Sequence, residues 1–582
     1  MDDRALRRRA GMMAASRFLF AAVLLLAPLP YGANRPLPWS LLALALALAA
    51  LLRAGAGVSG ERQPRPPAVV GLGFACLVAV AGWAALQGMR NLLPAGWAHP
   101  LWGEVGAWGL PVRPAVALAP ERALDNVMRF LAYLAAGWLA FLFAREERGA
   151  RWLLHLLLLV FALQAAYGLL RLFAGLEVLP GVAGGPGAGG NLSGSFVNRN
   201  HAATFLGMGF LAALALLMER VGPGLRERRR TALQQLLDGL FGRQWYVPTA
   251  LILIGTAVLL TASRGGFASL LVASVFLLFT TYLTTRPAPL PAAVVGVLLL
   301  ATGWTLLTLG GEPVLERLLA TEEIDTGRLQ IYALALEMIR DRPWLGQGYG
   351  GFEPIFMLYR DPRFSLIFDR AHNTYLEHAV ELGLPATVLL YGGMALLLGH
   401  LVAGVFRRRR NRIFPLFAAA STVLVGLHAL VDFSVQIPAV AVAYAAIMGL
   451  GLAQATPGRR RKRASRGDSK NEGDRPDSRE PNDDEAPSSD PHASGTSISM
   501  ISASSRNPPS FRGRSLPGGD GAGSVEEGAV GERDRAAARR MRRRFSSRSQ
   551  RRSSSPCMRL ATFSASSKPR ASPASAASRK SM

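Results

Sequence analysis

The sequence predicts an all-α membrane protein that crosses a bilayer about twelve times. Half of its 582 residues are hydrophobic, and the mean hydropathy is positive, at +0.23. Apolar runs of about 18 residues, long enough to cross a bilayer core of roughly 30 Å as a helix, recur along the first 455 positions. Arginine clusters separate these runs at regular intervals. These observations favour a polytopic helical bundle.

The twelve apolar runs define the expected membrane helices. The first run follows Arg7, Arg8 and Arg9, as in a signal peptide, but prolines follow it in place of a small-residue cleavage site. We therefore expect it to be retained as a helix. The predicted helices lie near residues 18–30, 37–53, 68–86, 124–144, 151–173, 200–218, 246–262, 266–284, 290–309, 374–402, 412–432 and 436–454.

The arginine clusters predict the orientation of the bundle. With twelve spans they all fall on one side, which the positive-inside rule assigns to the cytoplasm together with both termini. They lie at residues 4–9, 53–65, 145–151, 220–230, 286, 407–412 and 459–463. The opposite, extracytoplasmic side then receives the loops at 87–123, 174–200, 261–266, 310–373 and 432–438.

The net charge of +26 does not indicate a nucleic-acid partner. Residues 457–582 hold 27 Lys/Arg against 14 Asp/Glu, which is half of the excess in a fifth of the chain. This tail is rich in Ser, Arg, Pro and Gly and poor in aliphatic residues, so it is predicted to be disordered and cytoplasmic. The expected organisation is a transmembrane domain at 1–456 and a basic tail at 457–582. The two cysteines exclude a disulfide framework.

Residues 326–385 form a polar segment between two blocks of apolar runs, and the loop at 310–373 within it is the predicted working region. Residues 326–340 are expected to form an amphipathic helix in the membrane interface, with Asp325 or Thr326 as its N-cap. Its expected apolar face holds Leu329, Tyr332, Leu336 and Ile339. The glycines that follow, Gly348 among them, predict a tight turn whose amides could face a phosphate.

Three residues at the expected extracytoplasmic face have side chains suited to anion binding or proton transfer. Arg264 and Arg328 present forked donors that match phosphate oxygens, although an interface anchor and a solvated charge are the alternatives. His372 could accept a proton from a hydroxyl group, with Asn373 and Tyr375 to orient it; a merely hydrogen-bonded histidine is the alternative.

Weaker signals come from neighbouring spans. His428 and Asp432 are four residues apart, which predicts one face of the eleventh span and either a functional acid or a helix-pinning contact. Asn198 and Asn200 begin the sixth span, where they could bind substrate or simply cap the helix. No histidine pair has a spacing that favours zinc, so no metal is expected.

Four motifs together resemble the O-antigen ligase and O-antigen polymerase superfamily of bacterial inner-membrane glycan transferases. In chain order they are G-S-F-V-N-R-N-H, S-R-G-G, the R-L-Q-I-Y…D-R-P-W-L-G-Q-G-Y-G-G-F segment, and H-N-T-Y-L…E-L-G-L-P. The resemblance runs from about residue 194 to 451 and is strongest over 326–385. It implies that Arg264 and Arg328 bind the diphosphate of an undecaprenyl-linked glycan and that His372 assists the acceptor hydroxyl, without a metal or other cofactor.

The resemblance leaves the acceptor open. It could be lipid A-core, a growing glycan or a protein, as in lipopolysaccharide or exopolysaccharide biosynthesis, and membrane lipids are expected neighbours. An anion transporter of the bicarbonate type should place charges at the bilayer midplane and show inverted repeats, which the sequence lacks. A non-catalytic component of a polysaccharide export complex is a further alternative, and it predicts indifference to substitution of His372.

Overall fold

The computed structural model describes residues 3–58, 65–175, 190–224, 245–285, 323–360 and 367–456, and the regular structure in these ranges is helical. Nine of the described helices are long and apolar enough to cross a membrane, and two shorter apolar helices accompany them. They coincide with eleven of the twelve predicted spans. The twelfth, at 290–309, and the predicted tail lie outside the described residues. The protein is a multi-pass membrane protein.

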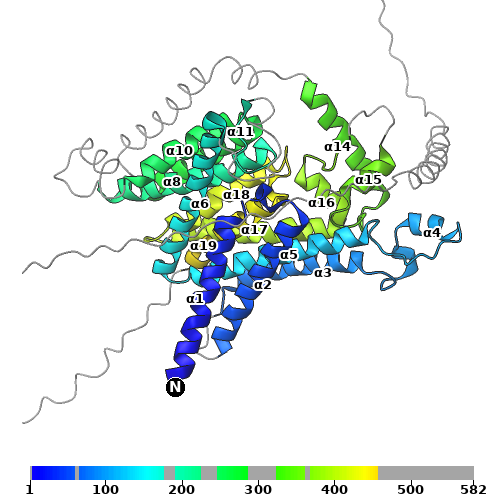
Figure 1. The fold of residues 1–582 in the computed structure, drawn as a ribbon, viewed down its shortest axis with the longest axis horizontal. Coiled ribbons are helices and arrows are strands. Elements are labelled where there is room, and N and C mark those ends of the chain that lie inside the picture. Colours follow the sequence, from blue (N-terminus) through cyan, green and yellow to red (C-terminus); the bar gives the residue numbers. More distant parts are fainter. Residues whose placement is uncertain are drawn as a thin grey trace, which may run out of the picture. The chain divides into compact units, whose positions relative to one another are not determined.

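The membrane helices are labelled in Figure 1. Their bounds are α1 Asp3–Leu26, α2 Pro36–Val58, α3 Ala68–Gly88, α5 Pro120–Phe143, α6 Glu147–Ala174, α8 Arg199–Gly224, α10 Tyr246–Leu260, α11 Arg264–Thr285, α17 Leu384–Arg407, α18 Ile413–His428 and α19 Pro438–Ala455. Short helices lie between them: η1 Tyr31–Ala33, η2 Ala95–Trp97, α4 Pro100–Gly106, α14 Glu323–Asp341, α15 Phe352–Tyr359, α16 Thr374–Leu382 and η3 Ser434–Gln436.

Helices α8 and α19 occupy the interior of the bundle, where almost every side chain of their spans is buried. Small residues allow α19 to approach its neighbours closely. A Cβ atom on Gly449 would lie 2.1 Å from the carbonyl oxygen of Gly137 on α5, so the two backbones are in direct contact. Without a hydrophobic driving force in lipid, such close packing is the main attraction between membrane helices.

One end of the bundle carries the segments that the sequence singled out, and we call it the His372 end. Hydrogen bonds join its loops: Ser195 Oγ donates to the Pro28 carbonyl at 2.5 Å, and the Leu192 amide donates to the Leu260 carbonyl at 2.9 Å. The Leu118 amide similarly donates to the Gln347 carbonyl at 3.0 Å. The polar loops therefore converge as the sequence predicted.

Helices α14, α15 and α16 form a small cap with a hydrophobic cluster of its own. The face of α14 in this cluster holds Ile331, Ala335 and Met338, whereas Leu329 and Leu336 are exposed. Apolar residues therefore occur on both sides of this helix, and contact of the predicted apolar face with the membrane interface stays a prediction. The predicted N-cap was wrong, since α14 begins at Glu323.

Gln87, at the end of α3, ties the cap to the bundle. Its Nε2 donates to the carbonyls of Leu345 at 2.7 Å and Glu381 at 3.0 Å, and its Oε1 accepts from the Tyr349 amide at 3.2 Å. The predicted span at 374–402 is in fact two helices, separated at Gly383. This residue has φ +80°, and a Cβ there would lie 2.6 Å from the Trp344 carbonyl oxygen.

Candidate functional site

Asp432 is the buried centre of the candidate site. It is 0% exposed and lies in the turn between α18 and α19, where α18 has already ended at His428. The prediction that His428 and Asp432 share one helix face was therefore wrong. Ser434 Oγ donates to the Asp432 carboxylate, and Asn200 Nδ2 donates to it at 3.3 Å. These bonds hold one carboxylate orientation.

His372 faces this carboxylate from a different segment of the chain. Its Nδ1 lies 3.9 Å from Asp432 Oδ1, too long for a hydrogen bond, and this nitrogen is buried without a hydrogen-bond partner in the described structure. The ring packs edge-on against Phe433, with centroids 5.1 Å apart, and against Phe368 at 6.2 Å. Its side chain remains 22% exposed. Nδ1 of the imidazole is thus buried and faces Asp432, while another part of the ring remains accessible.

Two further imidazoles surround the same carboxylate. His201, on α8, packs edge-on against Phe433 at 4.9 Å, and His428 Nδ1 is 2.6 Å from the hydroxyl of Thr204. Burial by itself would raise the pKa of Asp432, but the three neighbouring imidazoles and the Ser434 hydroxyl outweigh burial and hold that pKa below its usual range. Asp432 is therefore ionised at neutral pH.

The backbone at His372 is held in a left-handed conformation, with φ +52°. Such a conformation is uncommon for a residue other than glycine and persists only where the surroundings enforce it. Tyr332 Oη, on α14, donates to the His372 carbonyl at 3.2 Å and can also donate to the Leu430 carbonyl at 3.3 Å. On the other side, the Thr374 hydroxyl donates to the Asp432 carbonyl at 2.9 Å.

Arg370 and Glu377 fix the chain immediately before His372. Glu377 is fully buried and accepts from Arg370 Nη1 at 2.9 Å and from the Ala371 amide at 2.9 Å. Burial alone would lower the pKa of Arg370, but the Glu377 carboxylate that is bonded to it raises that pKa above its usual value. The buried Arg370–Glu377 ion pair therefore stays charged, and it fixes the backbone directly before His372.

The two predicted arginines lie on elements that contact this cluster. Arg264 begins α11; next to it, Ser263 Oγ donates to Asn200 Oδ1 at 2.8 Å. A Cβ on Gly265 would lie 3.1 Å from the His428 ring, so the α11 start packs on that histidine. Arg328 lies one turn before Tyr332 on α14, and its charge acts on His428. Both arginines therefore belong to helices that contact the Asp432 cluster.

The other predicted binding residues have structural partners. Asn373 caps α16 by accepting from the amides of Tyr375 and Leu376, each at 3.1 Å. Asn198 accepts from the Asn200 amide at 2.8 Å at the start of α8. Gly348 donates its amide to the Glu381 carbonyl at 2.9 Å. These contacts are those of caps and a tight turn, the alternatives that the sequence left open.

Tyr375 points away from His372, toward the interior of the bundle. Its hydroxyl donates to the Gly426 carbonyl at 2.7 Å, and its ring lies 4.7 Å from that of Tyr391. Sequence reasoning missed Arg370 and the role of Tyr332 in holding the loop. The only available signal for Arg370 was its position two residues before His372.

The assembled cluster has the parts of an acid–base and anion-binding site. A carboxylate beside an imidazole can stabilise the imidazolium that forms when the ring accepts a proton. Guanidinium groups nearby can bind phosphate oxygens. Within the six described ranges, no group of three or more His, Cys, Asp or Glu side chains is arranged to hold a metal ion.

Comparison with known proteins finds a family similarity in the central part of the chain. Residues 249–391 match the family model described as O-Antigen ligase. No curated protein matches the chain. The matched segment contains Arg264, Arg328 and His372, whereas Asn200 and Asp432 lie outside it. The similarity to O-antigen ligases is therefore a property of this central segment.

Proposed function

We propose that the protein transfers an oligo- or polysaccharide from a polyprenyl diphosphate carrier, undecaprenyl diphosphate in a bacterial inner membrane, to an acceptor hydroxyl. The reaction takes place at the extracytoplasmic face, and the acceptor is lipid A-core, a growing glycan or a protein. The observation that carries the proposal is the His372–Asp432 pair, 3.9 Å apart, beside the two helices that bear Arg264 and Arg328, in a chain whose residues 249–391 match the O-Antigen ligase model.

His372 acts as the general base in this proposal. Its accessible Nε2 accepts the proton of the acceptor hydroxyl while the hydroxyl oxygen attacks the anomeric carbon of the donor glycan. The bond between that carbon and the diphosphate breaks, and the bonding pair leaves with the polyprenyl diphosphate. Asp432, ionised and buried, stabilises the imidazolium through Nδ1. Catalytic contacts are often long in a free enzyme and shorten when substrate binds.

Arg264 and Arg328 serve the leaving group. As the glycosidic bond breaks, negative charge grows on the diphosphate, and two forked cations at the His372 end can neutralise it. A lysine at either position would supply the positive charge but not the paired N–H donors with which arginine binds two phosphate oxygens. We therefore expect a transferase that needs no divalent metal, since the two guanidinium groups neutralise the charge on the diphosphate that a metal neutralises in other transferases.

The test is glycan transfer by the purified full-length protein, with a synthetic polyprenyl diphosphate oligosaccharide as donor and a lipid extract as acceptor. His372→Ala should lower the rate by about 10²–10⁴-fold. Arg264→Gln and Arg328→Gln should also lower it, whereas Arg340→Gln, an exposed arginine at the end of α14, should not. Transfer should persist in EDTA. Full activity in all three site variants, at normal membrane abundance, would refute the assignment.

A further inference from the structure

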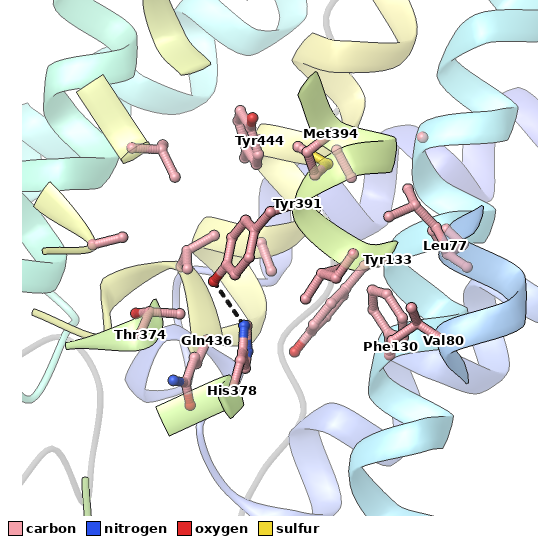
Figure 2. A pocket seen from close by; sticks show the side chains of 18 of the residues that line it. Leu77, Val80, Phe130, Tyr133, Thr374, His378, Tyr391, Met394, Gln436 and Tyr444 are labelled. Atoms are coloured by element: carbon pink, nitrogen blue, oxygen red, sulfur yellow. Dashed lines mark hydrogen bonds between the residues drawn. The ribbon is translucent and has the colours of Figure 1, made fainter. Parts of the chain in front are cut away.

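A cavity of about 250 Å³ lies inside the bundle, between α3, α5, α17, α18 and α19, with α16 at its His372 end (Figure 2). His378 Nδ1 and the Tyr391 hydroxyl form a hydrogen bond of 2.8 Å on its wall. His372 and Asp432 do not line it. The cavity is therefore distinct from the candidate catalytic cluster, although Arg370 and Thr374 bring it close to that cluster.

The wall of the cavity changes from polar to apolar along the bundle. The polar lining lies toward the His372 end, where α5 and α19 begin, and comprises Asn126, Arg129, Tyr349, Arg370, Glu381 and Gln436. The lining toward the opposite end comprises Leu134, Gly137, Leu397, Met448, Gly449 and Leu452. Arg129 and Gly137 are separated by about 12 Å along α5, at 1.5 Å per residue. The gradient matches a molecule with one polar and one apolar end.

Arg129 is a buried cation without a carboxylate partner in the described part of the chain. Its side chain donates to Asn126 Oδ1 and lies over the Trp39 ring at 4.4 Å, and the residue is only 8% exposed. None of the described acidic side chains reaches it within 4.0 Å. A charge buried in a membrane helix is costly unless it is paired, so it marks a functional site by default.

Three donors on the cavity wall have no acceptor in the described structure. They are Arg129 Nε, the Tyr133 hydroxyl and Gln436 Nε2, and each is buried. Buried polar groups are almost always hydrogen-bonded, because an unmet donor loses its interaction with water. These three unmet donors, one of them on the Arg129 cation itself, require a partner that supplies several acceptor oxygens and a negative charge. A phosphate group has both properties.

The cavity has room for one hydrocarbon segment beside a phosphate. An engineered cavity of about 150 Å³ accommodates benzene, so by proportion the whole cavity of about 250 Å³ accommodates about ten non-hydrogen atoms, those of the phosphate included. Two side-by-side acyl chains would need more space than this. The volume therefore favours a single chain over the paired chains of a phospholipid.

We propose that this cavity binds a single-chain lipid phosphate. The phosphate lies at Arg129, Tyr133 and Gln436, and the first carbons of its chain, about five, fill the cavity toward Leu452. Isoprenoid phosphates and unbranched alkyl phosphates share this chemistry. The site is independent of the transfer reaction proposed above, because none of its three donors belongs to the His372–Asp432 cluster.

Binding to the unmodified full-length protein tests the ligand class without any substitution. The delipidated protein in detergent is titrated with decyl phosphate, geranyl phosphate, decanol and dioctanoylphosphatidylglycerol, and binding is followed by native mass spectrometry and thermal unfolding. At least one of the two phosphates should bind one to one and at least tenfold more tightly than decanol and the two-chain lipid. Tighter geranyl phosphate binding assigns an isoprenoid ligand; tighter decyl phosphate binding assigns an unbranched one. Equal affinity for decanol overturns the proposal.

Substitutions of residues that line the cavity test the location of the lipid phosphate site. Arg129→Gln should weaken decyl phosphate binding at least tenfold and leave decanol binding unchanged. Arg122→Gln, an exposed arginine on the same helix, is the control and should have no effect. Gly426→Leu should weaken binding of both ligands by filling the cavity, because only the Tyr375 hydroxyl, at 3.4 Å, lies near the position that a Cβ atom on Gly426 would take.

A third variant guards against failure of Arg129→Gln to fold. Tyr133→Phe keeps the ring and removes one unmet donor, so it should weaken phosphate binding two- to fivefold and spare decanol. Unchanged phosphate affinity in both Tyr133→Phe and Gly426→Leu would place the ligand elsewhere and overturn the proposal, whatever the transfer activity of these variants.

Discussion

Replacing Asp432 with asparagine removes the charge that faces His372 and keeps the size of the side chain. The two partners are 3.9 Å apart, and the carboxylate is 1% exposed. With an effective dielectric constant of about 20, a full imidazolium at that distance gains about 4 kcal/mol from the carboxylate. Each 1.36 kcal/mol changes a rate tenfold, which makes about 10³-fold the upper limit of the loss. Partial exposure of His372 and a partly transferred proton reduce the expected loss to about 10²–10³-fold in kcat.

The assay is single-turnover transfer from a labelled polyprenyl diphosphate oligosaccharide by the purified protein. KM for the donor should change little, because Asp432 does not contact the donor in the proposed mechanism. Asp125→Asn, which alters an exposed carboxylate on α5, is the matched control. Thermal unfolding of each variant separates lost catalysis from lost folding.

The double variant shows whether the two residues act together. If Asp432 works only through the imidazole, His372→Ala combined with Asp432→Asn should be no slower than His372→Ala alone. Additive losses would show that Asp432 acts elsewhere. A folded Asp432→Asn variant that keeps transfer within about threefold of the unmodified protein would refute the reasoning, since no mechanism that needs the charge could tolerate its removal.

Three further substitutions test the surroundings of the site. Burial and the Glu377 carboxylate raise the pKa of Glu381 above its ordinary 4.5, so folding stability should fall as pH rises above that value; Glu381→Gln should therefore gain Tm relative to the unmodified protein between about pH 5 and pH 8. Gly348 has φ +113°, and a Cβ there would lie 2.5 Å from that of Ala117, so Gly348→Ala should cost about 3 kcal/mol in thermal unfolding while Gly392→Ala, which has open space, should not. Tyr332→Phe removes the hydroxyl that holds the His372 carbonyl and should lower transfer about three- to tenfold with little change in Tm; unchanged transfer would make this contact dispensable.

The sequence was sufficient to predict the membrane helices because a bilayer imposes a length and a hydrophobicity on each of them. It also predicted that the polar loops would converge, since alternating spans bring every second loop to the same end. The break at Gly383 was not predicted, because the apolar pattern continues across it and only the positive φ of the glycine marks the turn.

The pairing of His372 with Asp432 could not be predicted from the residues alone. These side chains are sixty positions apart, and their contact depends on where α18 ends. Periodicity instead placed Asp432 on a helix with His428. Hydrogen bonds from Tyr332 and Thr374 then fix the two loops against each other, and such long-range contacts leave no local signal in the sequence.

The residues around Asp432 come from both sides of the segment that matches the O-antigen ligase family. Asn200 precedes that segment and Asp432 follows it, while His372 lies inside it. Gln87, also outside, anchors the cap through three hydrogen bonds. A chimera that exchanged only residues 249–391 with a relative would therefore place a histidine loop from another protein against Asp432 and Asn200 of this chain. Chimeras of this chain should therefore exchange the whole helical bundle together.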